Sequence, residues 1–143
     1  AVLASLVRKS GHQVVPIPGP SAFASLVSVA GTGGKTLIFE GFLSPKPGKR
    51  RKRLSELLQT GDAFVLYESP FRIIKLLSDI ADIESSRNLV IGRELTKLHE
   101  EIIEGSAAEL KQDFASRSSI KGEFAIFVSG VKKTQLSEKS TDN

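Results

Sequence analysis

Residue types with distinctive chemistry are scarce in this sequence. The 143 residues include no cysteine, no methionine and no tryptophan, and only two histidines. The absence of cysteine excludes disulfide bonds, thiolate nucleophiles and cysteine-bound metal ions. The two histidines, His12 and His99, are too far apart in the sequence to provide the ligand spacing of a zinc site. We therefore predict no metal site.

Long apolar runs are missing as well. No stretch approaches the ~18–20 apolar residues that a helix needs to cross a bilayer, so we predict no membrane partner. With 40% hydrophobic and 25% charged residues, the chain has the composition of one domain with a well-filled core. The missing cysteines fit a reducing compartment, and we expect a cytoplasmic location.

Positive charge is concentrated in one short segment. The net charge is +4, and a run of eight residues without an acid contains six basic ones: Lys46, Lys49, Arg50, Arg51, Lys52 and Arg53. The remainder has 14 basic and 16 acidic residues, so the basicity is local. Stability alone does not explain the run, because like charges repel and cations oppose the dipole at a helix start. We interpret the six residues as contacts to nucleic-acid phosphates, with a solvated surface loop as the alternative.

Short apolar segments alternate with helical periodicities along the chain. This alternation is typical of an α/β fold, with a sheet flanked by helices. The segment 99–103 is expected to run antiparallel, which would make the sheet mixed. Strands are expected at 14–17, 36–42, 63–67, 88–91, 99–103 and 123–128. Helices are expected to begin at Ser21 (or at Pro20 after Gly19), at Arg51, at Ser69–Pro70 and at Ser106, the last with Glu109 in a capping box.

Three polar turns lie where such a sheet would place a ligand. Residues 18–22 join a strand to a helix, and a helix start presents unpaired N–H groups. Residues 67–72 and 93–101 follow strands at their carboxyl ends, where open α/β sheets bind ligands. Each turn also has a purely structural interpretation, such as a rigid turn or a salt-bridge network.

Six segments together resemble one protein family. Residues 15–22, 39–43, 49–54, 67–72, 93–101 and 122–124 are similar, in order and spacing, to the C-terminal half of the ribosomal RNA small-subunit methyltransferase I family. This family, part of the tetrapyrrole methylase superfamily, 2′-O-methylates a cytidine ribose of 16S rRNA. The run Arg-Glu-Leu-Thr-Lys-Leu-His-Glu-Glu at 93–101 distinguishes it from tetrapyrrole-methylating relatives. The sequence departs from the family at Ser44, usually proline, and at Phe71, usually histidine.

The resemblance implies S-adenosylmethionine as the cofactor, bound between this domain and an N-terminal domain. The proton acceptor stays unassigned, with Glu94, Lys97 and His99 as candidates. The implied partners are ribosomal RNA of the small ribosomal subunit and the N-terminal domain. Because members of the family commonly dimerise, the resemblance also implies a second copy in a homodimer. The implied cofactor-binding residues are Pro18, Gly19, Ser21, Ala22, Leu66, Tyr67, Arg93, Glu94, Glu123 and Phe124.

The resemblance also suggests how the chain is divided. Residues 1–12 would end a helix or linker from a missing N-terminal domain, although a trimmed N-terminus explains them equally well. Residues 13–131 would form the C-terminal α/β methylase domain, and the polar segment 132–143 a disordered tail. On this division we expect the isolated chain to be inactive. A tetrapyrrole methylase and a non-catalytic RNA-binding module are the alternative functions.

Overall fold

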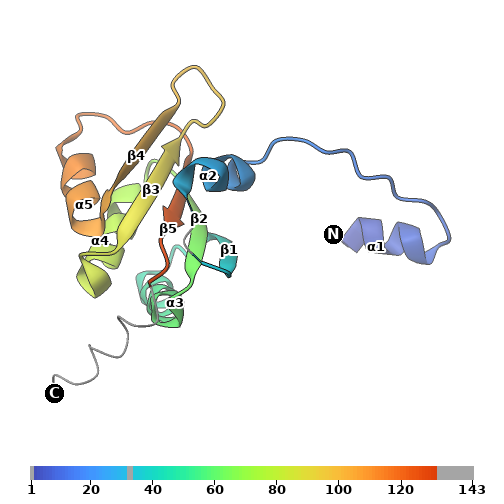
Figure 1. Ribbon diagram of the computed structural model, residues 1–143, viewed down its shortest axis with the longest axis horizontal. Coiled ribbons are helices and arrows are strands. Elements are labelled where there is room, and N and C mark those ends of the chain that lie inside the picture. The colour runs from blue at the N-terminus through green and yellow to red at the C-terminus, as the bar shows by residue number, and fades with distance from the viewer. Residues whose placement is uncertain (1, 32–33, 132–143) are drawn as a thin grey trace.

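The computed structural model describes residues 2–31 and 34–131, which form a five-stranded sheet with helices on both faces (Figure 1). The strands are β1 (Leu37–Phe42), β2 (Ala63–Glu68), β3 (Asn88–Arg93), β4 (Glu101–Ser106) and β5 (Phe124–Val128). The helices are α1 (Val2–Lys9), α2 (Ala22–Ala30), α3 (Pro47–Thr60), α4 (Ile73–Glu84) and α5 (Ala107–Ser116).

The sheet is mixed, as predicted. Its strand order is β1-β2-β5-β3-β4, with β1 parallel to β2 and every other pair antiparallel. The carboxyl ends of β1, β2 and β3 therefore lie at the same edge as the amino ends of β4 and β5. We call this edge the carboxyl edge of the sheet.

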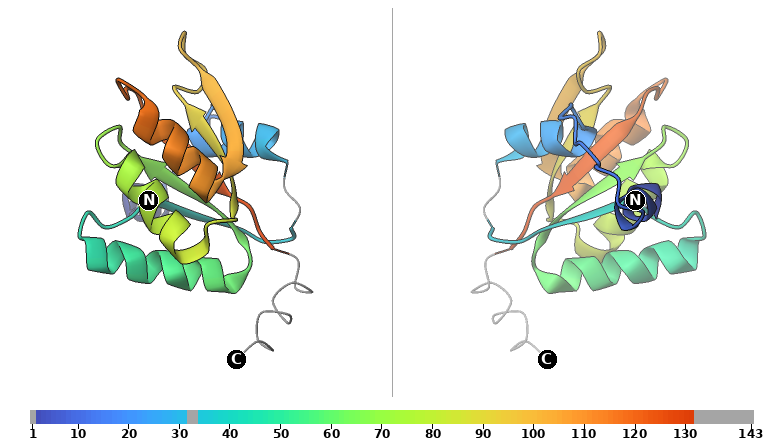
Figure 2. Two further views of the ribbon diagram at one scale, coloured as in Figure 1. Left: turned by 90° about the vertical axis from the view of Figure 1, so that its left-hand side faces the viewer. Right: turned by 90° about the vertical axis from the view of Figure 1, so that its right-hand side faces the viewer.

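The two faces of the sheet are covered unequally (Figure 2). Helices α3, α4 and α5 pack on one face over the larger core cluster, which includes the fully buried Leu54, Leu77 and Phe114. Helix α2 alone covers the other face, where Leu26 inserts against Val65 and its neighbours. Complete burial of such a side chain contributes about 1.5–3 kcal/mol, so these clusters hold the strand ends in place.

Two helix starts follow the predicted capping. Ser21 caps α2, and its side chain accepts a hydrogen bond from the N–H of Ala24. Ser106 caps α5, and the Ser106 N–H donates a hydrogen bond to the Glu109 carboxylate, which completes the capping box. A cap of this kind contributes about 1 kcal/mol.

Residues 14–17, expected as a strand, form none. They belong to an extended stretch that joins α1 to α2 and runs away from the sheet (Figure 1), and Ile17 is 90% exposed. The prediction was wrong because a short apolar segment forms a strand only where a neighbouring strand supplies hydrogen bonds.

Three element starts also differ from expectation. Helix α3 begins at Pro47 rather than Arg51, since proline fits the first turn of a helix. Helix α4 begins at Ile73, because the Ser69 carbonyl accepts from Arg72 and Ile73 and so closes a separate turn first. Strand β4 begins at Glu101 instead of His99, after a longer loop.

Two predicted boundaries remain predictions. The tail 132–143 lies outside the described residues, and the division between 1–12 and 13–131 is not marked by a change of packing. Within residues 2–31 and 34–131, no helix is both long and apolar enough to cross a membrane. The same residues contain no cluster of three or more potential metal ligands.

Candidate functional site

A pocket of about 510 Å³ opens at the carboxyl edge of the sheet. Its walls come from the start of α2, the ends of β1, β2 and β3, the start of β5 and the turns that follow β2 and β3. Ends of antiparallel and parallel strands meet here, so segments distant in sequence supply one cavity. A cavity of this size suits a small organic ligand.

The pocket brings together six of the residues singled out from the sequence. Five belong to the predicted cofactor set, and Lys97 was a candidate proton acceptor. These six wall residues are Ala22, Tyr67, Glu94, Lys97, Glu123 and Phe124.

The other predicted cofactor residues lie off the pocket wall. Pro18 and Gly19 are exposed on the stretch before α2, and Ser21 is engaged as the α2 cap. Leu66 is fully buried in the core, and Arg93 is paired with a carboxylate. The candidate proton acceptor His99 is exposed on the loop between β3 and β4 and does not line the pocket.

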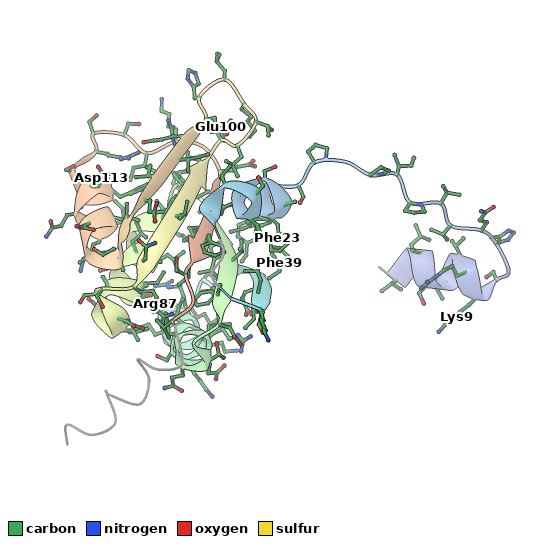
Figure 3. The ribbon with its side chains drawn as sticks, in the orientation of Figure 1. Lys9, Phe23, Phe39, Arg87, Glu100 and Asp113 are labelled. Carbon is green, nitrogen blue, oxygen red and sulfur yellow. The ribbon has the colours of Figure 1, made fainter. Side chains whose placement is uncertain are left out.

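Aromatic side chains form one wall of the pocket. Tyr67 makes edge-to-face contacts with Phe42 and Phe39, at ring-centroid distances of 5.7 and 5.2 Å. Phe39 in turn packs against Phe23 of α2 at 5.1 Å, and Figure 3 shows these two side chains together. The Tyr67 hydroxyl accepts a hydrogen bond of 2.9 Å from the N–H of Phe23. Tyr67 thus ties α2 to the sheet and fixes this wall.

Another wall of the pocket is formed by β3, the turn after it and the start of β5. At Gly92 of β3, a Cβ atom would lie only 2.8 Å from the Leu95 side chain, so Leu95 packs directly over the strand. Gly92, Leu95, Phe124 and Ala125 give this part of the pocket an apolar surface at the strand ends. A flat heterocycle such as adenine needs such a slot, with a few backbone hydrogen bonds to fix its edge.

Glu94 locks the rim of the pocket. Its backbone adopts a positive φ of 48°, and its N–H donates to the Glu123 carbonyl at 3.0 Å. Its Oε1 accepts from the Glu123 N–H at 2.8 Å and from Lys97 Nζ at 3.1 Å. Lys97 also reaches the Glu123 carboxylate at 3.1 Å. The loop after β3 and the start of β5 are therefore joined as one wall.

These contacts set the charge states of Glu94 and Lys97, two of the three candidate proton acceptors. The backbone N–H of Glu123, followed by Lys97, lowers the pKa of Glu94 below its usual 4.5. Hydrogen bonds to Glu123 and Glu94 raise the pKa of Lys97 above 10.5. At neutral pH Lys97 is protonated and has no lone pair to offer, and the Glu94 Oε1 is already engaged. The geometry favours a positioning role for both.

A second ion network joins the end of β3 to the start of β4 and the end of α5. Glu101, at the start of β4, accepts from Arg93 at 2.9 Å and from Arg117 at 3.0 and 3.1 Å. Arg117 stacks over the Phe114 ring at 4.3 Å from its centroid and pairs with Asp113. This explains why Arg93, although predicted in the cofactor site, holds β3 to β4 instead of lining the pocket.

The structure divides the basic run into two sets. The three arginines are paired with acids from other elements: Arg50 with Asp79, Arg51 with Asp79 and Asp82, and Arg53 with Glu40 and Glu56. Arg50 is 5% exposed. By contrast, Lys46, Lys49 and Lys52 make no ion pair within residues 2–31 and 34–131.

The lysines lie on the first turns of α3, which begins at the carboxyl edge of the sheet. Helix α3 starts directly after β1, so its first turns are at the carboxyl edge. Lys46 is the N-cap residue of α3, and Pro47 follows it. The three lysines therefore place unneutralised positive charge on the part of α3 that begins at the carboxyl edge, the edge at which the pocket opens.

Sequence reasoning did not assign several residues of the pocket wall. Their signal was position alone, because each stands at a strand end or in the turn after it, next to residues that were singled out. Neutral side chains in such places give no motif of their own, and Glu68 belonged to the segment 67–72 without being assigned a role. These wall residues are Phe42, Glu68, Ser69, Pro70, Gly92, Leu95 and Ala125.

Comparison with known proteins assigns this arrangement to a family. The family model for tetrapyrrole (corrin/porphyrin) methylases matches residues 2–111, which is most of the chain. The chain belongs to the tetrapyrrole methylase family. Among the solved structures with a similar fold are a cobalt precorrin-4 methyltransferase of cobalamin biosynthesis (TM-score 0.60, 16% identity) and the methyltransferase CobJ (TM-score 0.61, 19% identity). Their alignments cover 88% and 90% of this chain and 56% of each solved chain.

Other tetrapyrrole methylase relatives are more similar in sequence. The ribosomal RNA small subunit methyltransferase I of Borrelia garinii subsp. bavariensis is 45% identical over 130 residues, which cover 90% of this chain and 58% of the relative. The proteins of the same name from Thermotoga maritima and Bacillus subtilis are 39% and 33% identical, over 85% and 90% of this chain. These alignments cover 54% and 44% of the two relatives. The chain thus spans about half the length of the curated relatives it matches.

Proposed function

We propose that this chain forms the C-terminal half of an S-adenosylmethionine-dependent methyltransferase that methylates the ribose 2′-hydroxyl of a cytidine in small-subunit (16S) ribosomal RNA. The observation that carries the proposal is the likeness of nearly the whole chain, up to 45% identical, to relatives named ribosomal RNA small subunit methyltransferase I. The pocket at the carboxyl edge is the place in this chain where such a cofactor would bind.

The pocket fits the adenosine part of S-adenosylmethionine. It combines an aromatic wall at Tyr67 and Phe42, an apolar surface at Leu95 and Ala125 and a rim locked by Glu94. The cofactor would supply a methyl group on a positively charged sulfur. What this chain contributes is position, since an aligned donor and acceptor react far faster than free ones. The part of the relatives' length that this chain does not span would supply the rest of the site.

The unpaired lysines of α3 support RNA as the substrate. Each cation that neutralises a phosphate adds to a salt-dependent affinity. Lys46, Lys49 and Lys52 are available for this because no carboxylate of the described residues engages them, whereas the arginines of the same run are occupied. We therefore assign phosphate contact mainly to the lysines.

A methylase acting on a small tetrapyrrole is the competing function. The likeness to a cobalt precorrin-4 methyltransferase is at 16% identity and concerns the fold. A small substrate would not require the cluster of unpaired lysines. We further propose action in the cytoplasm, on the small ribosomal subunit; a homodimer stays an expectation drawn from the resemblance.

The test uses the full-length gene product with radiolabelled S-adenosylmethionine and small ribosomal subunits. Methyl transfer to a cytidine whose adjacent phosphodiester then resists alkaline cleavage supports the proposal. Methyl transfer to a precorrin-type substrate and none to RNA overturns it.

The role of the α3 lysines in phosphate contact is tested by comparing two double substitutions that change the net charge equally. Lys49→Glu/Lys52→Glu should raise the KM for the RNA roughly tenfold or more. The dependence of RNA affinity on salt concentration should also become weaker, by the amount expected for the loss of about two phosphate contacts. Lys9→Glu/Lys35→Glu, with the same change in charge at exposed positions elsewhere, is the control. Equal effects from the two pairs would assign the loss to net charge and remove the phosphate role from α3.

A further inference from the structure

The carboxylate of Glu68 lies on the pocket wall and takes no part in the ion network of Glu94, Lys97 and Glu123. Glu68 ends β2 and lines the pocket, yet the residue is only 3% exposed and its side chain 1%. Its partner across the sheet is Phe124 of β5, which also forms part of the wall. Directly paired residues on neighbouring antiparallel strands present their side chains on one face, so Glu68 stands beside Phe124.

The two oxygens of this carboxylate are used unequally. Oε1 accepts from the N–H of Ser69 at 2.8 Å and lies 2.8 Å from Arg72 Nε. Oε2 accepts no hydrogen bond from any residue that the structure describes.

The free oxygen must touch open space. Among the described residues, every fully buried side-chain nitrogen or oxygen has a hydrogen-bond partner. Because Oε2 has none, it belongs to the few atoms of Glu68 that remain accessible, and the pocket is the open space that Glu68 lines. A carboxylate oxygen in a nearly dry place with no donor is costly unless a ligand supplies one.

We propose that Glu68 is a ligand-binding residue of this pocket, and that its Oε2 accepts a hydrogen bond from a ribose hydroxyl. The Arg72 guanidinium already balances the charge of Glu68. The remaining capacity of Oε2 is therefore that of an acceptor for a neutral donor, and a hydroxyl suits it better than a second cation. This inference rests on the proposed function, which brings two riboses to the site.

The two riboses would use Glu68 differently. If the hydroxyl belongs to the cofactor, Glu68 contributes to binding. If it is the hydroxyl that receives the methyl group, the C–S bond breaks and a C–O bond forms. The electron pair then stays on sulfur, and the hydroxyl proton passes to Oε2. Glu68 would then be a catalytic residue, and loss of a general base costs about 10²–10⁴ in rate.

The experiment compares Glu68→Gln with Asp79→Asn in the full-length protein. The glutamine keeps the shape and one acceptor oxygen but places an amide donor at the position of Oε2. Asp79 is the matched control: it is also a buried carboxylate paired with arginine, and it is absent from the pocket wall. If Glu68→Gln does not fold, Glu68→Asp, which keeps the charge and withdraws the oxygens, replaces it.

Three measurements distinguish the outcomes. Calorimetry gives the Kd for S-adenosylhomocysteine and for its 2′,3′-dideoxy analogue, and single-turnover assays at saturating cofactor give the rate of methyl transfer as a function of pH. A tenfold to hundredfold weaker Kd for S-adenosylhomocysteine in Glu68→Gln, with no change for the dideoxy analogue, supports the cofactor ribose. An unchanged Kd with a rate at least about 100-fold lower, and loss of the acidic limb of the pH profile, supports the acceptor ribose.

Other outcomes overturn the inference. If Glu68→Gln changes the Kd and the rate no more than Asp79→Asn does, Glu68 serves only to hold the turn after β2. Equal weakening of both cofactor analogues has the same meaning. Failure of the proposed function is separate, because it would appear as absent binding and methylation in the unsubstituted protein.

Discussion

Gly122 shows how narrowly single residues define the pocket rim. It precedes β5 with a φ of +96°, and a Cβ atom built on it would lie 2.5 Å from Cγ of Glu94. Glycine is required here both for the backbone conformation and for the space that Glu94 occupies. The lock between Glu94 and Glu123 therefore depends on a residue that contributes no side chain.

Substitution of Gly122 is expected to loosen this lock. Gly122→Ala should lower the free energy of unfolding by about 1–3 kcal/mol, since it adds backbone strain and displaces Glu94. Gly48→Ala is the control, because Gly48 lies in α3 with free space around it and alanine favours the helix. Urea unfolding should show the two substitutions shifting the midpoint in opposite directions; a shared direction would contradict the account.

Glu101 makes stability depend on pH. Hydrogen bonds and charge from Arg117, followed by Arg93, lower the pKa of Glu101 below its usual 4.5. A carboxyl whose folded pKa is depressed stabilises the protein above its unfolded pKa, and this stabilisation is lost as the pH falls through the folded value. Glu101→Gln should thus cost about 1 kcal/mol or less at pH 7, because the group is about a third exposed. Urea titrations at pH 7, 5 and 3 should show that cost shrinking; a constant cost would assign the effect to shape.

At the scale of elements, α3 is held to α4 by charge. The Arg50 side chain is 6% exposed and its Nε lies 2.6 Å from Asp79, while Arg51 reaches the same carboxylate from solvent. Breaking a buried pair leaves one charge uncompensated, so Arg50→Met should destabilise the protein by about 3–5 kcal/mol. Its neighbour Lys49, changed to methionine, should alter thermal unfolding little. Similar melting temperatures for both variants would show that the pair is dispensable.

The sequence predicted the local features of the fold but not the ion pairs that form between elements. The α/β class, the mixed sheet and the caps at Ser21 and Ser106 follow from local patterns and were expected. The division of the basic run was not, because Glu40, Asp79 and Asp82 reach it from β1 and α4 through the fold. Charge compensation across elements leaves no local signal.

The location of the pocket and some of its wall residues could also be predicted from the sequence, but others could not. Strand ends indicated the carboxyl edge, and Tyr67, Glu94 and Phe124 do line the cavity. Pro18 and Gly19, in contrast, lie on an exposed stretch. Glu68 was not assigned because a glutamate at a strand end has no pattern that separates a ligand contact from a structural one. Only its burial and its unequal oxygens single it out.

At the scale of the molecule, α1 and the stretch after it stand apart from the sheet (Figure 1). No residue of α1 is buried, and its apolar side chains Val2 and Leu3 are about three-quarters exposed. Removal of residues 1–12 should therefore change the melting temperature by no more than about 2 °C. Leu26→Ala, which empties a buried site under α2, should cost about 2–5 kcal/mol in the same assay. A large loss on truncation would show that α1 packs against the sheet in solution.

The position of β5 has a consequence for how the protein is made. This strand is the last among the described residues, yet it lies in the middle of the sheet, between β2 and β3. During synthesis the earlier strands emerge first, and the pairs β1–β2 and β3–β4 have no common neighbour until Val128 has left the ribosome. A nascent chain that stalls before Phe124 therefore exposes two unpaired strand edges, and chaperones would meet it as two separate halves.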